Sequence, residues 1–176
     1  MTRRDPSSSD DPGSDPRRSS PAPGDSPWFR GLWLWLLVAL AGMAALGYTI
    51  AFAIETPLWS WHQDPMAAAL WPGDGEPAVP AVVAGYRRHA MGMLGPTLSA
   101  WAVALLVVVA IPFRRREPWA WWCLALSLMA WFPFDTAVSI VEGIWINVIF
   151  NLTGFAMIAI PLAGTYRHFR GARRPS

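Results

Sequence analysis

The chain has 176 residues, of which 53% are hydrophobic, and it carries 12 Trp and a formal net charge of only +2. Soluble domains of this length rarely combine such an apolar composition with so many indoles, so the composition indicates a membrane protein. The small net charge gives no support to nucleic-acid binding, and the single cysteine, Cys123, excludes an intramolecular disulfide and a zinc site built from several thiolates.

The N-terminal segment differs in composition from the rest of the chain. Residues 1–27 are rich in Pro, Ser, Gly, Asp and Arg and contain no bulky apolar residue beyond Met1. Such a segment cannot bury enough apolar surface to offset the entropy of ordering. We therefore predict a disordered cytoplasmic tail over residues 1–30.

Four apolar segments follow, at about residues 31–54, 91–113, 119–141 and 146–166. As helices, they are long enough to cross a hydrocarbon core of about 30 Å. The first ends near Ala51-Phe52-Ala53, which resembles a signal-peptide cleavage site, but it is longer than the usual apolar region of about 7–15 residues. We expect it to be retained. The predicted fold class is all-α, a polytopic membrane protein with four transmembrane helices in an antiparallel bundle.

The connections between the spans differ in length. Spans two and three are joined by the short charged turn Arg114–Pro118, and spans three and four by a tight hairpin at about Glu142–Trp145. Residues 55–90 form the long extracytoplasmic loop, in which residues 66–71 are predicted to form a short interfacial helix.

Arginine placement predicts the orientation. Twelve of the fourteen arginines precede span one, separate spans two and three, or follow span four. Basic residues are in excess in cytoplasmic loops, so both termini are expected in the cytoplasm, with residues 167–176 as a basic tail. The expected location is the cell (plasma or inner) membrane.

Polar residues interrupt the last two spans at matched positions. Asp135 and Asn151 are each eight residues from Gly143, and Ser139 and Asn147 are each four residues from it. Antiparallel helices bring equal separations to equal depth, because both rise about 1.5 Å per residue. We therefore expect Asp135 to contact Asn151, directly or through one water, and Ser139 to lie level with Asn147.

Two interpretations of these polar residues stay open. In the first, they are hydrogen-bonding glue between helices. In the second, they line an outward-facing pocket, because an ionisable residue inside a membrane is a functional candidate by default. The candidate ligand-binding residues are Asp135, Ser139, Glu142, Asn147, Asn151 and Glu55, with Arg87, Arg88 and His89 at the rim.

Catalytic and metal-binding patterns are not visible in the sequence. It has no phosphate-binding glycine loop, and no pair among Glu55, His62, His89 and Glu142 has a metal-ligand spacing. We predict neither an enzyme nor a bound cofactor. Gly92, Gly95 and Ser99 are interpreted as small residues that allow close helix packing.

One stretch resembles a known group of proteins. The run Pro112-Phe113-Arg114-Arg115, followed by Glu117-x-Trp119-Ala120-Trp121-Trp122 and then by Asp135, is similar to small, uncharacterised four-helix integral membrane proteins of bacteria. The resemblance covers about residues 85–165. It implies the fold alone and brings no activity or functional residue.

Two classes of function therefore remain. The first is a non-enzymatic membrane protein, either an accessory subunit or a binder of a small hydrophobic or lipid-like ligand. The second is a small transporter or proton-coupled carrier that uses Asp135. The expected partners are the lipid bilayer and either another membrane protein or a second copy of this chain.

Overall fold

The computed structural model describes residues 26–53, 56–70 and 81–170. Four of its helical segments are long and apolar enough to cross a membrane. They are α1 (Pro27–Ala53), α3 (Ala81–Val108) with its π-helical continuation η3 (Val109–Phe113), α4 (Pro118–Val141) and α5 (Trp145–Arg170). A short turn η2 (Pro57–Trp59) and helix α2 (Ser60–Leu70) lie between α1 and α3. The prediction of a helical chain with four long apolar helices is confirmed.

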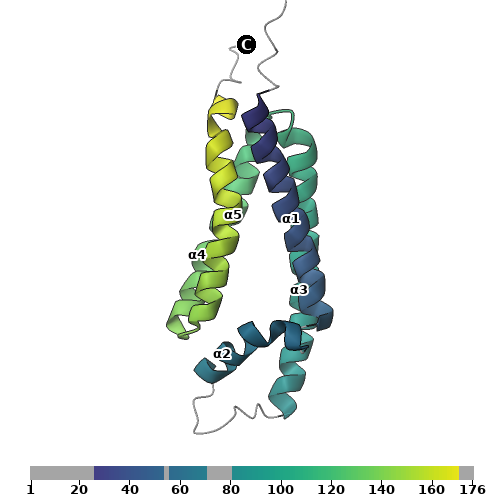
Figure 1. Cartoon of the computed structure of the whole chain (residues 1–176), viewed down its shortest axis with the longest axis vertical. Coiled ribbons are helices and arrows are strands. Elements are labelled where there is room, and N and C mark those ends of the chain that lie inside the picture. The colour runs from purple at the N-terminus through teal and green to yellow at the C-terminus, as the bar shows by residue number, and fades with distance from the viewer. Residues whose placement is uncertain (1–25, 54–55, 71–80, 171–176) are drawn as a thin grey trace, which may run out of the picture.

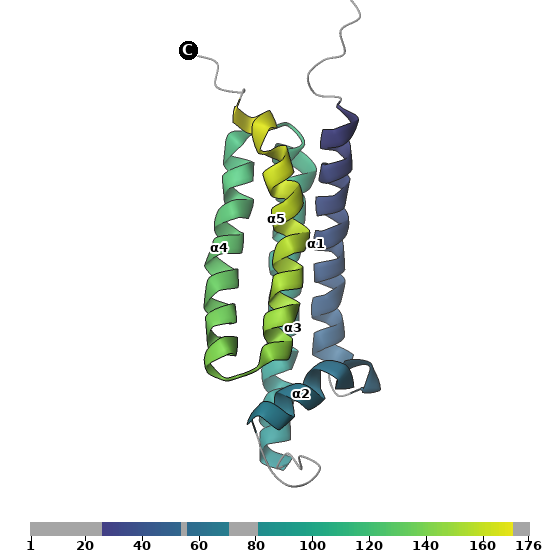
Figure 2. The same ribbon diagram turned by 60° about the vertical axis from the view of Figure 1, so that its left-hand side comes forward.

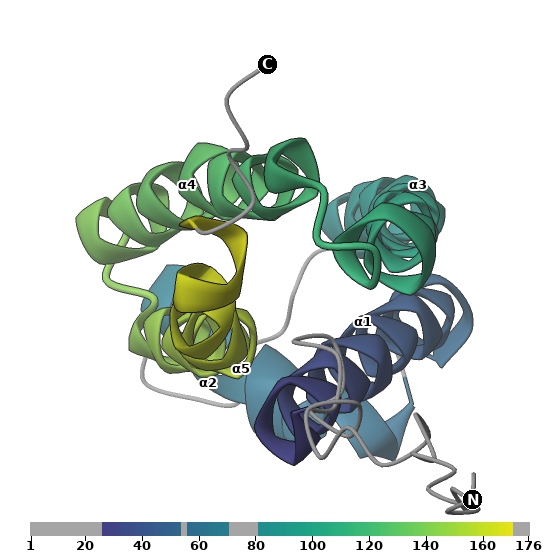
Figure 3. The ribbon, with the colours of Figure 1, turned by 90° about the horizontal axis from the view of Figure 1, so that it is seen from above.

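The long helices lie side by side and alternate in direction, with α1 next to α3 and α4 next to α5 (Figures 1, 2 and 3). The start of α1, the turn between α3 and α4, and the end of α5 therefore meet at one end of the molecule. We call this the arginine end, because it holds Arg30, Arg114, Arg115, Arg116, Arg167 and Arg170. Helix α2 crosses the opposite end (Figure 1).

Three helix ends differ from the expected spans. Helix α1 begins at Pro27, α3 begins at Ala81, and α5 continues to Arg170. Hydropathy locates the apolar part of a helix, whereas polar residues stabilise its ends. At the start of α1, the Ser26 Oγ accepts a hydrogen bond from the Phe29 N–H at 3.3 Å. At the end of α5, basic residues in the last turn interact favourably with the partial negative charge of the helix C-terminus. The parts of the predicted tails at residues 1–25 and 171–176 lie outside the described residues.

The short helix expected over residues 66–71 is longer than expected. Helix α2 already begins at Ser60, and it continues through Pro65 to Leu70. Trp71 lies outside the described residues. The loop between the first two spans is therefore partly helical, with α2 at the end of the bundle.

Small residues allow α1 and α3 to approach closely. A Cβ added to Gly95 would collide with the carbonyl oxygen of Gly47. Next to this contact, the Ser99 hydroxyl donates to the Ala44 carbonyl at 2.8 Å. The packing role predicted for Gly95 and Ser99 is confirmed, whereas a Cβ added to Gly92 would meet nothing within 4 Å.

The hairpin between α4 and α5 turns at Gly143, as predicted. Gly143 has a φ of +71°, which favours glycine. The Gly143 N–H donates to the Ile140 carbonyl at 3.1 Å, and the Ile144 N–H donates to the Ser139 carbonyl at 2.8 Å. This pair of hydrogen bonds is the Schellman arrangement that ends a helix. It fixes the register in which α4 faces α5.

The packed core occupies the half of the bundle near the arginine end. Its fully buried side chains include Leu36, Leu40, Val109, Phe113, Leu124 and Ile158. Large apolar side chains also cover the outer surface, where Phe52, Phe134 and Val141 are 83%, 72% and 86% exposed. An apolar outer surface of this extent is suited to lipid rather than to water.

Candidate ligand-binding site

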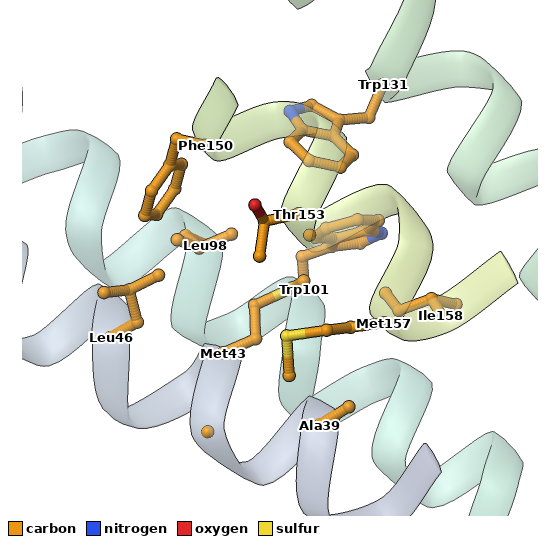
Figure 4. A pocket seen from close by; sticks show the side chains of 12 residues that line it. Ala39, Met43, Leu46, Leu98, Trp101, Trp131, Phe150, Thr153, Met157 and Ile158 are labelled. Carbon is orange, nitrogen blue, oxygen red and sulfur yellow. The ribbon is translucent and has the colours of Figure 1, made fainter. Parts of the chain in front are cut away.

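An apolar cavity of about 280 Å³ lies between the four long helices, beside the packed core (Figure 4). Its lining consists of Ala39, Gly42, Met43 and Leu46 from α1, Leu98 and Trp101 from α3, Trp131 from α4, and Phe150, Thr153, Gly154, Met157 and Ile158 from α5. Nearly all of these side chains are apolar, so the cavity suits an apolar group.

The α1 wall of the cavity is one face of a helix. Ala39, Gly42, Met43 and Leu46 are spaced i, i+3, i+4 and i+7, and this spacing places them on the same side of α1. A Cβ added to Gly42 would have no heavy atom within 4 Å. The absence of a side chain at Gly42 therefore leaves space that a ligand can use.

Two indoles form the wall contributed by α3 and α4. The ring centroids of Trp101 and Trp131 lie 6.3 Å apart, with their planes tilted by 53°. The Trp131 Nε1 donates to the Asp135 Oδ2 at 3.1 Å, one helical turn further along α4. A Cβ added to Gly154 would lie 3.4 Å from the Trp131 ring, so the indole packs directly over Gly154. Asp135 thus positions a side chain that lines the cavity.

A shallow apolar groove adjoins the cavity on the outer surface. It is lined by Trp35 from α1 and by Ile149, Leu152, Thr153, Ala156, Met157 and Ile160 from α5. Thr153 and Met157 line both the groove and the cavity, and both are exposed. The groove and the cavity therefore adjoin at these two residues of α5.

Hydrogen bonds link α2, α5 and α4 at the end opposite the arginines. The Asn147 Nδ2 donates to the Ser139 Oγ at 2.6 Å, and this hydroxyl donates to the Asp135 main-chain carbonyl at 2.7 Å. The Asn147 side chain is also hydrogen-bonded to His62, whose Nδ1 lies 3.2 Å from the Gln63 Nε2. The prediction that Ser139 lies level with Asn147 is confirmed.

Aromatic contacts also hold α2 against α5. The Trp61 and His62 rings lie 6.4 and 5.8 Å from the ring of Phe150, which lines the cavity. Burial lowers the pKa of His62 from its ordinary 6.5, and the hydrogen bond with Asn147 opposes part of this change. His62 is therefore mostly neutral at pH 7, where it packs against an apolar ring.

The direct hydrogen bond expected between Asp135 and Asn151 is not formed. The Asp135 carboxylate instead accepts from Trp131, while Asn151 is 1% exposed and its Nδ2 has no partner among the described residues. The Trp131 indole competes well with Asn151 for the Asp135 carboxylate, because it lies one turn away on the same helix. A hydrogen bond within one helix costs less conformational entropy than one between two helices. A contact through one water stays a prediction.

The other predicted site residues lie apart from the cavity. Glu142 is exposed at the C-cap of α4, Arg87 is partly buried on α3, and Arg88 and His89 are exposed on the same helix. Glu55 lies outside the described residues. None of the predicted polar residues that the structure describes lines the cavity. Among the described residues, no group of three or more His, Cys, Asp or Glu is placed to hold a metal ion.

Sequence reasoning missed the apolar lining. Trp101, Trp131 and Phe150 were indistinguishable in sequence from other aromatic residues of apolar spans. One signal was available, because Gly42 and Gly154 both remove a side chain from the middle of an apolar helix. Such glycines mark either close helix packing or a space between helices, and only the structure separates the two.

Comparisons with known proteins do not place this chain in a group. No family of known proteins, no curated protein and no solved structure matches it. The resemblance to small four-helix bacterial membrane proteins therefore stays a prediction.

Proposed function

We propose that the chain is a multi-pass protein of the cell membrane with both termini in the cytoplasm. Support comes from the arginines, twelve of fourteen of which flank the spans on one side. Reporters fused after Ser8, within residues 73–75, at Glu117 and after Arg174 test this topology. We expect cytoplasmic signals from the fusions after Ser8, at Glu117 and after Arg174. A cytoplasmic signal from the fusion within residues 73–75 would contradict the proposal.

Within the membrane, the proposed function is to bind a small hydrophobic or lipid-like ligand between the four long helices. The observation that carries this proposal is the apolar cavity of about 280 Å³ with its lateral groove. Ligand sites usually measure about 300–1,000 Å³ and are mostly apolar. A cavity just below this range suits one acyl or isoprenoid chain better than a phospholipid with two chains.

The size of the cavity can be set against that of a chain. The cavity of about 280 Å³ has room for part of one apolar chain but not for a whole phospholipid. The ligand's polar head would then remain outside the cavity. The groove between α1 and α5 gives a chain of this kind access from the lipid.

Photolabelling tests the binding. A palmitic acid that carries a diazirine on its chain is incorporated into nanodiscs with the full-length protein, illuminated, and mapped by mass spectrometry. We expect labels on the cavity lining, in the α1 segment around Met43 and the α5 segment around Met157. Replacing Gly42 with Phe should remove most of this labelling, because the ring would fill the open space at the α1 wall.

A matched variant controls for the substitution itself. Gly31 is also on α1 and also has nothing within 4 Å of an added Cβ, but it does not line the cavity. Gly31→Phe should label like the unmodified chain. Equal labelling of the unmodified chain and both variants, or labels spread over the outer surface, would contradict the proposal.

A proton-coupled carrier is the second candidate, and one contact favours it. The Asp135 carboxylate holds the indole of Trp131, so a change in Asp135 protonation would act on the cavity wall. Asp135→Asn keeps a hydrogen-bond acceptor but removes the ionisable carboxyl group. The flux of a ligand across vesicle membranes that contain the protein is the measurement. If that flux exists and loses its pH dependence in this variant, the carrier is supported. If the ligand binds unchanged and no flux is seen, a binding protein is supported.

A further inference from the structure

A second site is indicated at the arginine end, away from the cavity. Two arginines of the turn between α3 and α4 lie on aromatic rings of α1. The Arg116 Cζ is 4.7 Å from the centre of the Phe29 ring, and the Arg114 Cζ is 5.1 Å from that of Trp33. Stacking on a ring fixes the plane of a guanidinium and leaves its edge available for hydrogen bonds.

The two guanidinium groups stack on rings at neighbouring positions of α1. Phe29 and Trp33 are four residues apart on α1, so their rings lie on one face, about 6 Å apart along the helix axis. His168 joins the same place from α5, because its ring lies 5.1 Å from the Phe29 ring. The turn between α3 and α4 and helix α5 therefore bring cationic or hydrogen-bonding groups to one face of α1.

The backbone at Arg116 is unusual. Its φ is +61°, a left-handed conformation that costs free energy for a residue with a side chain. Arg116 is partly buried, and its Nη2 has no hydrogen-bond partner among the described residues. The His168 Nδ1 is likewise buried without a partner there, while its Nε2 lies 3.4 Å from the Ser26 Oγ. Buried polar atoms that lack partners are costly, so this arrangement invites an acceptor.

No protein carboxylate of the described chain serves as that acceptor. Glu117 is the one described acid in the turn, and its Oε2 already accepts from the Trp119 Nε1 at 2.7 Å. Six described arginines surround this end. The positive charge is therefore not compensated within the described part of the molecule.

We propose that Arg114, Arg116 and His168 bind the phosphate of an anionic lipid headgroup. A phosphate offers several acceptor oxygens and matches the planar fork of arginine. The site lies at the end of the spans, where a headgroup would be found. This proposal uses the membrane placement but does not depend on the cavity, so either site can fail without the other.

The test compares two adjacent arginines. Full-length protein in neutral detergent is titrated with phosphatidylglycerol or with phosphatidylcholine of the same acyl chains, and bound lipid is counted by native mass spectrometry. We expect tighter retention of phosphatidylglycerol. Arg116→Gln should weaken that retention by about tenfold, whereas Arg115→Gln, which removes the same charge from an exposed residue, should change it by less than about twofold.

Further arms separate the alternatives. Arg116→Lys keeps the charge but loses the fork, and should recover only part of the binding. Inorganic phosphate is added in excess as a separate probe. If it binds at Arg116 and the protein prefers neither lipid, the site belongs to free phosphate instead of a headgroup. Equal losses for Arg115→Gln and Arg116→Gln, at unchanged thermal stability, would overturn the site, because they would show a diffuse electrostatic attraction.

Discussion

Asn147 on α5 and Ser139 on α4 are joined by a hydrogen bond of 2.6 Å between Nδ2 and Oγ. This bond joins the two helices four residues to either side of the Gly143 turn, in the register that the turn fixes. Asn147 is also hydrogen-bonded to His62, so this one side chain interacts with both α4 and α2.

The Asn147–Ser139 pair should show an energetic coupling. In a double-mutant cycle with Asn147→Ala and Ser139→Ala, we expect about 0.5–2 kcal/mol, the range found for hydrogen bonds between membrane helices. The free energy of unfolding in mixed micelles is the measurement. Strictly additive losses would show that the observed geometry contributes no stability.

Asn151 should behave differently from Asn147. Because its Nδ2 is buried without a partner among the described residues, Asn151→Leu should raise the free energy of unfolding by about 1 kcal/mol. A loss of stability instead would mean that the amide does have a partner. A cycle with Asp135→Leu would then show whether a water-mediated contact with Asp135 supplies it.

The close contact between α1 and α3 at Gly95 should make that position sensitive to an added side chain. Gly95→Ala should lower the free energy of unfolding by about 1–3 kcal/mol, because the new Cβ would lie 2.7 Å from the Ala51 nitrogen. Gly92→Ala is the control on the same helix and should be neutral or slightly stabilising. Equal effects at both positions would rule out a close crossing at Gly95.

The titration of His62 is the fourth prediction. Its pKa, followed by NMR in a chain that carries His89→Gln and His168→Gln, should lie below 6.5, because burial outweighs the hydrogen bond with Asn147. Asn147→Ala should lower the pKa further, since that hydrogen bond favours the charged form. A pKa above 6.5 in the unmodified site would contradict the packing of His62.

The same shift predicts how α2 responds to pH. The docked state binds its proton less readily than the undocked state, so docking is strongest above pH 6.5 and weakens as the pH falls through 6.5 toward the lower pKa of the docked state. The distance between spin labels on α2 and α5 measures this. His62→Phe keeps a ring there and should remove the pH dependence.

The fold and part of the site follow from sequence for clear physical reasons. Apolar length predicts the four spans, and Gly143 predicts the register, because a fixed turn sets the depth of every residue after it. The hydrogen-bond partner of a side chain depends on which neighbour competes best for it. Asp135 had both Trp131 and Asn151 within reach, and residue spacing alone does not predict which of the two it binds. The cavity could not be predicted, because empty space results from how four helices cross.

The most direct measurement for the central claim is the mass of what the chain carries out of the membrane. Native mass spectrometry of full-length protein released in mild detergent should show a bound species with the mass of a single-chain lipid-like molecule. Gly42→Phe should lose that species, and Gly31→Phe should keep it. If the unmodified chain carries no such species, or if Gly42→Phe carries it at the same occupancy, the cavity is not a ligand site.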